Sequence, residues 1–155
     1  MAGVDPWLQP AAHALIQAGE EMAGAAEGLT SDQLWTTPGG AASVGYHLRH
    51  IAGSIDRLLT YARGAALDRR QYEMLAAESR PGTGDAAALV GEARAAIAGA
   101  LAVLRDTPAD GLLEARTVGR KARPTTLLGL LFHIGEHTQR HAAQIITTAK
   151  VVRAG

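Results

Sequence analysis

Apolar residues recur at helical spacing in four stretches of the chain, at residues 7–29, 43–63, 85–105 and 125–152. When residues are placed about 100° apart, the apolar positions of each stretch fall on one face, which is typical of an amphipathic helix. Four such helices in 155 residues predict an all-α fold, a four-helix bundle that forms a single domain over residues 1–155. The apolar face of the first stretch contains Trp7, Ala11, Leu15, Ala18, Met22, Ala25 and Leu29.

Polar caps and helix breakers indicate where these helices begin and end. Ser43 and Asp85 stand at N-cap positions, where a side-chain oxygen can accept a hydrogen bond from a first-turn N–H. Proline and glycine interrupt the chain at residues 36–40 and 79–84, so we expect the first and second helices, and the second and third, to be separated there.

Two connections are long enough to carry structure of their own. Residues 64–84 exceed a tight antiparallel turn, which allows a crossover between the second and third helices, and residues 66–78 within them can form a short extra helix. Residues 106–124 can form either a short helix or a hairpin.

Balanced charge and the lack of cysteine narrow the functional classes. The chain has 15 Lys and Arg against 15 Asp and Glu, so it lacks the basic character of sequence-independent nucleic-acid binding. Without cysteine it has no disulfide, no thiolate metal ligand and no protein thiol nucleophile. We read no signal peptide and no apolar stretch of the roughly 18 residues that span a bilayer. We therefore expect a cytoplasmic protein with no nucleic-acid or membrane partner.

Three histidines stand at four-residue intervals in the last helix, at His133, His137 and His141. Residues four apart lie on the same helical face, and neutral imidazole is the commonest protein ligand of metals. The helical angles turn His137 and His141 toward the apolar face and leave His133 at its edge. We predict that His137 and His141 ligate a metal; the alternative is that hydrogen bonds satisfy them in the interior. His13 falls off the apolar face of its own helix, so we expect it in solvent.

A third ligand must come from another helix, and the second helix offers two candidates. His47 lies about 60° from the centre of the apolar face and His50 about 120° away, so periodicity alone favours His47. Imidazole is long enough for an edge position to reach a site near one end of the bundle, so His50 stays a candidate. Four further residues near the expected site could bind an anionic ligand: Tyr46, Arg49, Arg57 and Arg140.

The segment "HIGEH" at residues 133–137 also matches the inverted zincin pattern H-x-x-E-H. In that pattern Glu136 would be the general base, and a carboxylate further along the chain would complete the metal site. No Asp or Glu follows Glu136, and Glu136 projects away from the apolar face. The sequence therefore disfavours a metalloprotease.

The segments "HIAGSIDRLL" and "HIGEHTQRHAAQII", about 80 residues apart, together resemble the DinB/YfiT-like superfamily of metal-dependent bundles. The resemblance covers nearly the whole chain, and the final histidine pair is its most specific part. It implies a four-helix bundle with up-down-down-up connectivity. It also implies a metal site made by His50, before "IAGS", together with His137 and His141. On this resemblance we favour His50 over His47, against the angular argument.

The resemblance also implies a class of chemistry. Members with a known activity tend to use a low-molecular-weight thiol such as mycothiol or bacillithiol. A metal that binds such a thiol lowers its pKa and supplies a thiolate at neutral pH. The expected function is thus that of a divalent-metal-dependent enzyme, with Zn or Ni as the metal, acting on a small molecule as a thiol-dependent S-transferase or isomerase.

Two rival hypotheses belong to other classes. One is a metal-binding or stress-associated bundle without catalytic turnover; an open coordination position facing a pocket would favour the enzyme over it. The other is a homodimer in which the histidines line an interface between copies of the chain. An apolar bundle makes dimerisation plausible, although no motif in the sequence specifies it.

Overall fold

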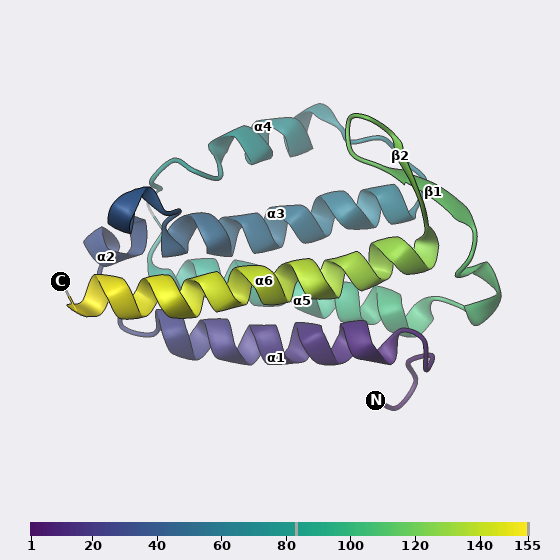
Figure 1. The fold of residues 1–155 in the computed structure, drawn as a ribbon, viewed down its shortest axis with the longest axis horizontal. Helices are drawn as coiled ribbons and strands as arrows, with labels where there is room; N and C mark the ends of the chain where they lie inside the picture. The colour runs from purple at the N-terminus through teal and green to yellow at the C-terminus, as the bar shows by residue number, and fades with distance from the viewer. Residues whose placement is uncertain (83, 155) are drawn as a thin grey trace.

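Four long helices form a bundle in the computed structural model, which describes residues 1–82 and 84–154 (Figure 1). They are α1 (Gln9–Ala26), α3 (Val44–Ala62), α5 (Ala86–Asp106) and α6 (Leu127–Ala154). Each of the four stretches with helical apolar spacing corresponds to one of these helices. The prediction of an all-α four-helix bundle is confirmed.

Contacts between the helices fix their directions. The start of α6 lies against the start of α1, where Gly135 faces Ala11, and Arg153 near the end of α6 donates to the carbonyl of Glu27, just after α1, at 2.6 Å. α1 and α6 are therefore parallel. Gly3, before α1, lies beside Arg105, near the end of α5, so α5 runs opposite to α1. α3 also runs opposite to α6 (Figure 1). Because α3 and α5 are thus parallel, the chain between them must travel back along the bundle.

That return connection carries α4 (Arg69–Ala77), close to the extra helix predicted at residues 66–78. A side chain of α4, Gln71, anchors it to α3. Gln71 is buried, and its amide nitrogen donates to the Asp56 carboxylate at 2.8 Å and to the Thr60 hydroxyl at 2.9 Å. The position of α4 over α3 matters for the site described below, because the residue that ends α4 reaches into it.

The other connections contain shorter elements. A hairpin, one of the two outcomes predicted for residues 106–124, is formed by strands β1 (Ala115–Val118) and β2 (Arg123–Thr126), which pair antiparallel. It extends two residues beyond that segment, so α6 begins at Leu127 rather than at Thr125. A helix of five residues, α2 (Ser31–Trp35), was not predicted, because it is too short to show periodicity. Two single turns of 3-10 helix complete the chain, at Pro38–Gly40 and Ala109–Gly111.

The predicted N-caps are present. The backbone N–H of Tyr46 donates to the Ser43 hydroxyl at 3.1 Å, and that of Ala88 donates to the Asp85 carboxylate at 2.8 Å. Each cap satisfies a first-turn donor that would otherwise lack a partner in its helix.

The core follows the predicted apolar faces, with one error. Trp7 is 73% exposed, although it was expected to face the core. Helix α1 begins only at Gln9, so the helical angle does not apply to Trp7, and its neighbour Leu8 is buried instead. His13 lies in solvent, as predicted. The largest fully buried side chains are Leu8, Leu15, Met22, Leu34, Leu48, Ile51, Ile55, Leu104, Leu130, Leu131, Ile134 and Ile145.

Helix α5 corrects another expectation. By length and composition alone it is apolar enough to cross a membrane, whereas we expected no stretch of the chain to be so. Its many alanines raise its hydropathy, while three of its larger apolar residues, Leu89, Ile97 and Leu104, are buried in the bundle core. The same composition therefore also suits a helix that packs in a bundle.

Gly135 permits the close approach of α6 to α1, and this generates a stability prediction. A Cβ atom at position 135 would lie 2.9 Å from Cα of Ala11, closer than packed atoms tolerate. We expect Gly135→Ala to lower the free energy of unfolding by about 1–3 kcal/mol, because the helices must separate. Urea denaturation measures the change.

The same substitution elsewhere provides the control. Gly99, in the middle of α5, has no atom within 4 Å of its Cβ position. Gly99→Ala should therefore stabilise the protein by about 0.5–1 kcal/mol through helix propensity alone. A Gly135→Ala protein as stable as Gly99→Ala would contradict this account of the contact between α1 and α6.

Candidate metal centre

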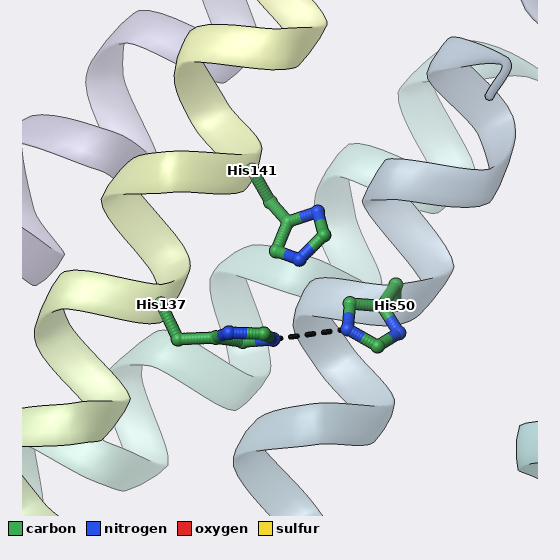
Figure 2. A group of neighbouring side chains, drawn as sticks. All are labelled: His50, His137 and His141. Atoms are coloured by element: carbon green, nitrogen blue, oxygen red, sulfur yellow. Dashed lines mark hydrogen bonds between the residues drawn. The ribbon is translucent and has the colours of Figure 1, made fainter. Parts of the chain in front are cut away.

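Four histidines from two adjacent helices meet in the bundle. His47 and His50 come from α3, and His137 and His141 come from α6. Because α3 and α6 are antiparallel, the lower residue number on one helix meets the higher on the other: His47 lies beside His141, and His50 beside His137. Figure 2 shows His50, His137 and His141 pointing toward one another between the two helices.

Three of these histidines are placed as ligands of one metal ion would be. His50, His137 and His141 each offer a ring nitrogen, and these atoms all lie within 4.8 Å of one another. The Nε2 atoms of His50 and His137 are 2.9 Å apart. Zinc bound at 2.0–2.1 Å in tetrahedral geometry holds its nitrogen ligands roughly 3.3 Å apart. The donor set and its spacing therefore fit a divalent metal.

A buried carboxylate orients His50. Glu78, the residue that caps the end of α4, accepts a hydrogen bond from Nδ1 of His50 at 2.7 Å. With its proton on Nδ1, the imidazole turns the lone pair of Nε2 toward His137 and His141. A carboxylate in this position fixes the tautomer of a metal-binding histidine and makes its other nitrogen a better ligand.

The charge of Glu78 is balanced by a buried arginine. Nη1 of Arg57 donates to the other carboxylate oxygen at 2.6 Å, and the two side chains are only 9% and 5% exposed. Gly53 makes room for this pair, since a Cβ atom there would lie 2.5 Å from the carboxylate oxygen and 2.7 Å from Nη1. The glycine of "IAGS" thus has a packing role beside the site.

His47 is buried and contacts His141 rather than the other two histidines. The Nδ1 atoms of His47 and His141 are 2.9 Å apart, so one of them must donate to the other. Figure 2 shows the second ring nitrogen of His141 turned toward His50 and His137. If His141 donates from Nδ1, its Nε2 has the free lone pair that a metal needs, and His47 is the acceptor that orients it. Both candidates on α3, His47 and His50, therefore reach the cluster, in different positions.

Arg140 completes a chain of hydrogen bonds through the cluster. Its guanidinium lies 2.6 Å from Nδ1 of His137, and because guanidinium can only donate, Nδ1 accepts and the proton of His137 sits on Nε2. That proton points at Nε2 of His50. Binding a metal at Nε2 of His137 requires the proton to leave Nε2. If it moves to Nδ1, Arg140 must release the ring.

Burial keeps His47, His137 and His141 neutral at physiological pH. It lowers the pKa of His47 and His137 from the ordinary 6.5 to about 4, and that of His141 to about 3. The nearness of His50 lowers the pKa of all three further, because two imidazolium cations side by side would repel each other. Neutral imidazole is the form that ligates metals, so these three rings have the charge state that metal binding requires.

A cavity of about 240 Å³ opens beside the cluster. His50, His133 and His137 form part of its wall. A larger hollow, about 560 Å³, lies between α1 and α5 and is lined mainly by alanine and glycine, away from the histidines. The smaller cavity is therefore the one that adjoins the candidate metal ligands.

The "HIGEH" segment is arranged differently from a protease site. His133 lies at the edge, as predicted, and Nδ1 of His133 is 2.5 Å from the carboxylate of Glu136. Both side chains are about two-fifths exposed. These two residues and His137 could together hold a cation, but the chain has no acidic residue after Glu136 to complete a zincin site.

The residues considered for anion binding all have protein partners. Arg49 donates to the carbonyl of Arg80 at 2.7 Å and lies over the ring of Trp35. Arg57 and Arg140 are held by Glu78 and His137, and Tyr46 stacks on His50 with ring centroids 5.3 Å apart. Anion binding by these four residues stays a prediction.

Glu78 contacts a candidate metal ligand but is not among the residues that the sequence singles out. It stands at the end of the predicted segment 66–78, 28 residues from His50. Its contact depends on where α4 docks, which no spacing in the sequence reveals. The capping box of Asp68 and Gln71 gives the start of α4 and was a signal that could have been read.

Comparison with known proteins places the chain in a family. A family model described as the DinB superfamily matches residues 14–145, which confirms the resemblance seen in the histidine motifs. A similar solved structure carries the description "YfiT from Bacillus subtilis is a probable metal-dependent hydrolase with an unusual four-helix bundle topology". It has a TM-score of 0.68 and 19% identity, and the match covers 95% of this chain and 86% of that one, which shows a shared fold. No curated protein matches the sequence significantly.

The lowered pKa values predict how the metal-free protein responds to pH. Unfolded histidine takes up a proton near its ordinary pKa of 6.5, whereas His47, His137 and His141 resist protonation in the folded state. The unfolded state therefore binds more protons than the folded state as pH falls, and the free energy of unfolding should drop between pH 7 and pH 5. Urea denaturation with a chelator present measures this slope.

A matched pair of variants tests the assignment. His141→Gln removes one resisting imidazole and should flatten the slope, whereas His13→Gln removes an exposed imidazole and should leave the slope as it is. Equal slopes in His141→Gln and the unsubstituted protein would show that burial of the cluster does not set the pH response.

Proposed function

We propose that this chain, which belongs to the DinB superfamily, is a divalent-metal-dependent enzyme that acts on a small molecule. The observation that supports the proposal most is the cluster of His50, His137 and His141, whose ring nitrogens lie within 4.8 Å of one another. Two of these histidines also form part of the wall of a 240 Å³ cavity. A three-histidine site leaves at least one coordination position for a non-protein ligand, and the cavity gives such a ligand a way in.

The residues fit Zn²⁺ or Ni²⁺, because imidazole suits both ions. When bound, such a metal lowers the pKa of a water or thiol in its open position and so supplies a nucleophile at neutral pH. The chain's own residues prepare the site for it. Glu78 holds the proton of His50 on Nδ1, which leaves the lone pair of its Nε2 for a metal. Nε2 of His141 presents a lone pair in the same way in the tautomer whose Nδ1 donates to His47.

The finer proposal is a thiol-dependent S-transferase or isomerase. The chain has no cysteine, so a thiol would arrive as a low-molecular-weight cofactor and bind at the open position. Hydrolysis by metal-activated water is the second candidate, favoured by the description of the structurally similar YfiT as a probable metal-dependent hydrolase. Turnover of ester and thioester substrates is measured with and without an added thiol. Turnover that needs the thiol would indicate the thiol-dependent reaction, and turnover without it would indicate hydrolysis.

A metal-binding bundle without turnover is the rival from another class. The cavity beside His50 and His137 argues for the enzyme, since a purely structural metal site is normally closed by protein ligands. Stoichiometric metal with no exchangeable water or thiol at the metal would instead favour the rival.

Metal content of the site variants tests the ligand assignment. Protein purified without a metal-affinity tag and loaded with Zn²⁺ should hold about one ion per chain. His50→Ala, His137→Ala and His141→Ala should each lose it, because two remaining imidazoles hold zinc weakly. Elemental analysis after gel filtration measures the ratio.

Two further variants guard against a wrong ligand set. His133→Ala should keep the metal, since His133 belongs only to the exposed group with Glu136. His47→Ala should keep it with reduced affinity, because only the partner of His141 is lost. Loss of metal in His47→Ala together with retention in His50→Ala would overturn the assignment in favour of His47.

Removing the charge of Glu78 should weaken metal binding without removing a ligand. Glu78→Gln keeps the size of the side chain but loses the anion beside His50, so the affinity for Zn²⁺ should fall roughly 10–100-fold. Competition with a chelator of known affinity measures the change. Glu73→Gln is the control, because Glu73 lies exposed on the same helix and pairs only with Arg69. Equal affinities in the two variants would contradict a role for Glu78.

A further inference from the structure

The cavity beside the histidines has walls of a particular chemistry. α3 contributes Leu58 and Tyr61, α4 contributes Tyr72 and Leu75, and Leu67 lies between them. At about 240 Å³ the cavity falls below the usual range for drug-sized ligands. Its walls and volume thus suit one small molecule with an aromatic or aliphatic body.

The charge of the lining is positive. Two arginines, Arg57 and Arg120, are among the residues that form the cavity, and no lining residue is acidic. Arg57 is buried, and its charge is matched by Glu78. Arg120 is exposed, and within the described parts of the chain its guanidinium has no carboxylate partner and no hydrogen-bond acceptor. One uncompensated positive charge therefore stands at the cavity.

The hairpin fixes the backbone that carries Arg120. Arg120 follows Gly119 in the turn between β1 and β2, where Gly119 has a φ of 75° and accepts a hydrogen bond from the N–H of Ala122 at 3.0 Å. Arg116 of β1 donates to the carbonyl of Ala62 at 2.7 Å, which ties the hairpin to the end of α3. The guanidinium lies over the ring of Tyr72, with Cζ 5.6 Å from the ring centroid. Arg120 is thus directed toward α4 and the cavity.

From these observations we propose that the cavity binds a small carboxylate with an apolar body, and that Arg120 holds its carboxylate. This rests on the proposed function, since the cavity is the substrate site of the same centre. Apolar walls favour the body of the molecule, and the unpaired guanidinium favours an anionic end. With the carboxylate at Arg120, the rest of the molecule extends along the cavity toward His50 and His137. Arg120 is therefore a specificity residue and takes no part in the chemical step.

The test uses the full chain and two probes of equal shape. 3-Phenylpropanoate carries the carboxylate, and its amide, 3-phenylpropanamide, is neutral. Ligand-observed NMR titration of the metal-depleted protein should show tighter binding of the carboxylate. Arg120→Gln should weaken carboxylate binding roughly tenfold or more and leave amide binding unchanged, because only a charge-assisted hydrogen bond is lost.

Two variants control for site and for charge. Lys121→Gln removes a positive charge from the same turn, but Lys121 does not line the cavity, so the affinities of both probes should stay the same. Leu75→Trp, on the partly exposed face of α4, should block the cavity and abolish binding of both probes. The proposal is overturned if Lys121→Gln weakens carboxylate binding as much as Arg120→Gln does, or if Leu75→Trp leaves binding intact.

Metal loading separates this inference from the proposed function. Carboxylate binding that appears only with Zn²⁺ and ignores Arg120→Gln would place the carboxylate on the metal, which overturns the inference and leaves the metal site standing. Arg120-dependent binding in a protein that takes up no metal would support the inference while the proposed function fails. No carboxylate binding at millimolar concentration, with or without metal, would overturn the inference as well.

Discussion

The buried carboxylate of Glu78 joins the histidine cluster to the rest of the fold. It lies between Arg57 and His50 on α3, so it neutralises one side chain and orients the other. Taking such a pair out of water is costly, and removing one partner would leave an unmatched buried charge. The contact therefore depends on α4, which Gln71 pins to α3, and on Gly53, whose missing side chain leaves room for the pair. The crossover from α3 to α5 is what brings Glu78 to this place.

Burial of the histidines favours metal binding but lowers the stability of the metal-free protein in acid. It lowers the pKa of His47, His137 and His141, which keeps them neutral and able to bind a metal. The same burial makes the metal-free protein sensitive to acid. As pH falls, the histidines of the unfolded chain take up protons that the buried imidazoles do not, so the free energy of unfolding decreases. Hydrogen bonds offset part of that cost, from Arg140 through His137 and His50 to Glu78. A bound metal would replace the interaction between His137 and His50 with stronger ones.

Much of the fold was predictable because its signals are local. Apolar spacing gave the four long helices, and Ser43 and Asp85 gave two of their starts. The pair His137 and His141 was predictable because both lie on one helix. The choice between His47 and His50 was not, since helical angles measure only direction from the core and both side chains reach the cluster. Glu78 could not be found, because its contact is made across α3 and α4 by tertiary docking alone.

X-ray absorption spectroscopy of the zinc-loaded protein would test the central claim most directly, because it counts the imidazoles around the metal. The account predicts three imidazole nitrogens at about 2.0–2.1 Å and a non-protein ligand in the remaining position. Fewer than three imidazoles would remove His50, His137 and His141 as a common site. Four would bring His47 or His133 into the coordination sphere and close the position that the proposed chemistry needs.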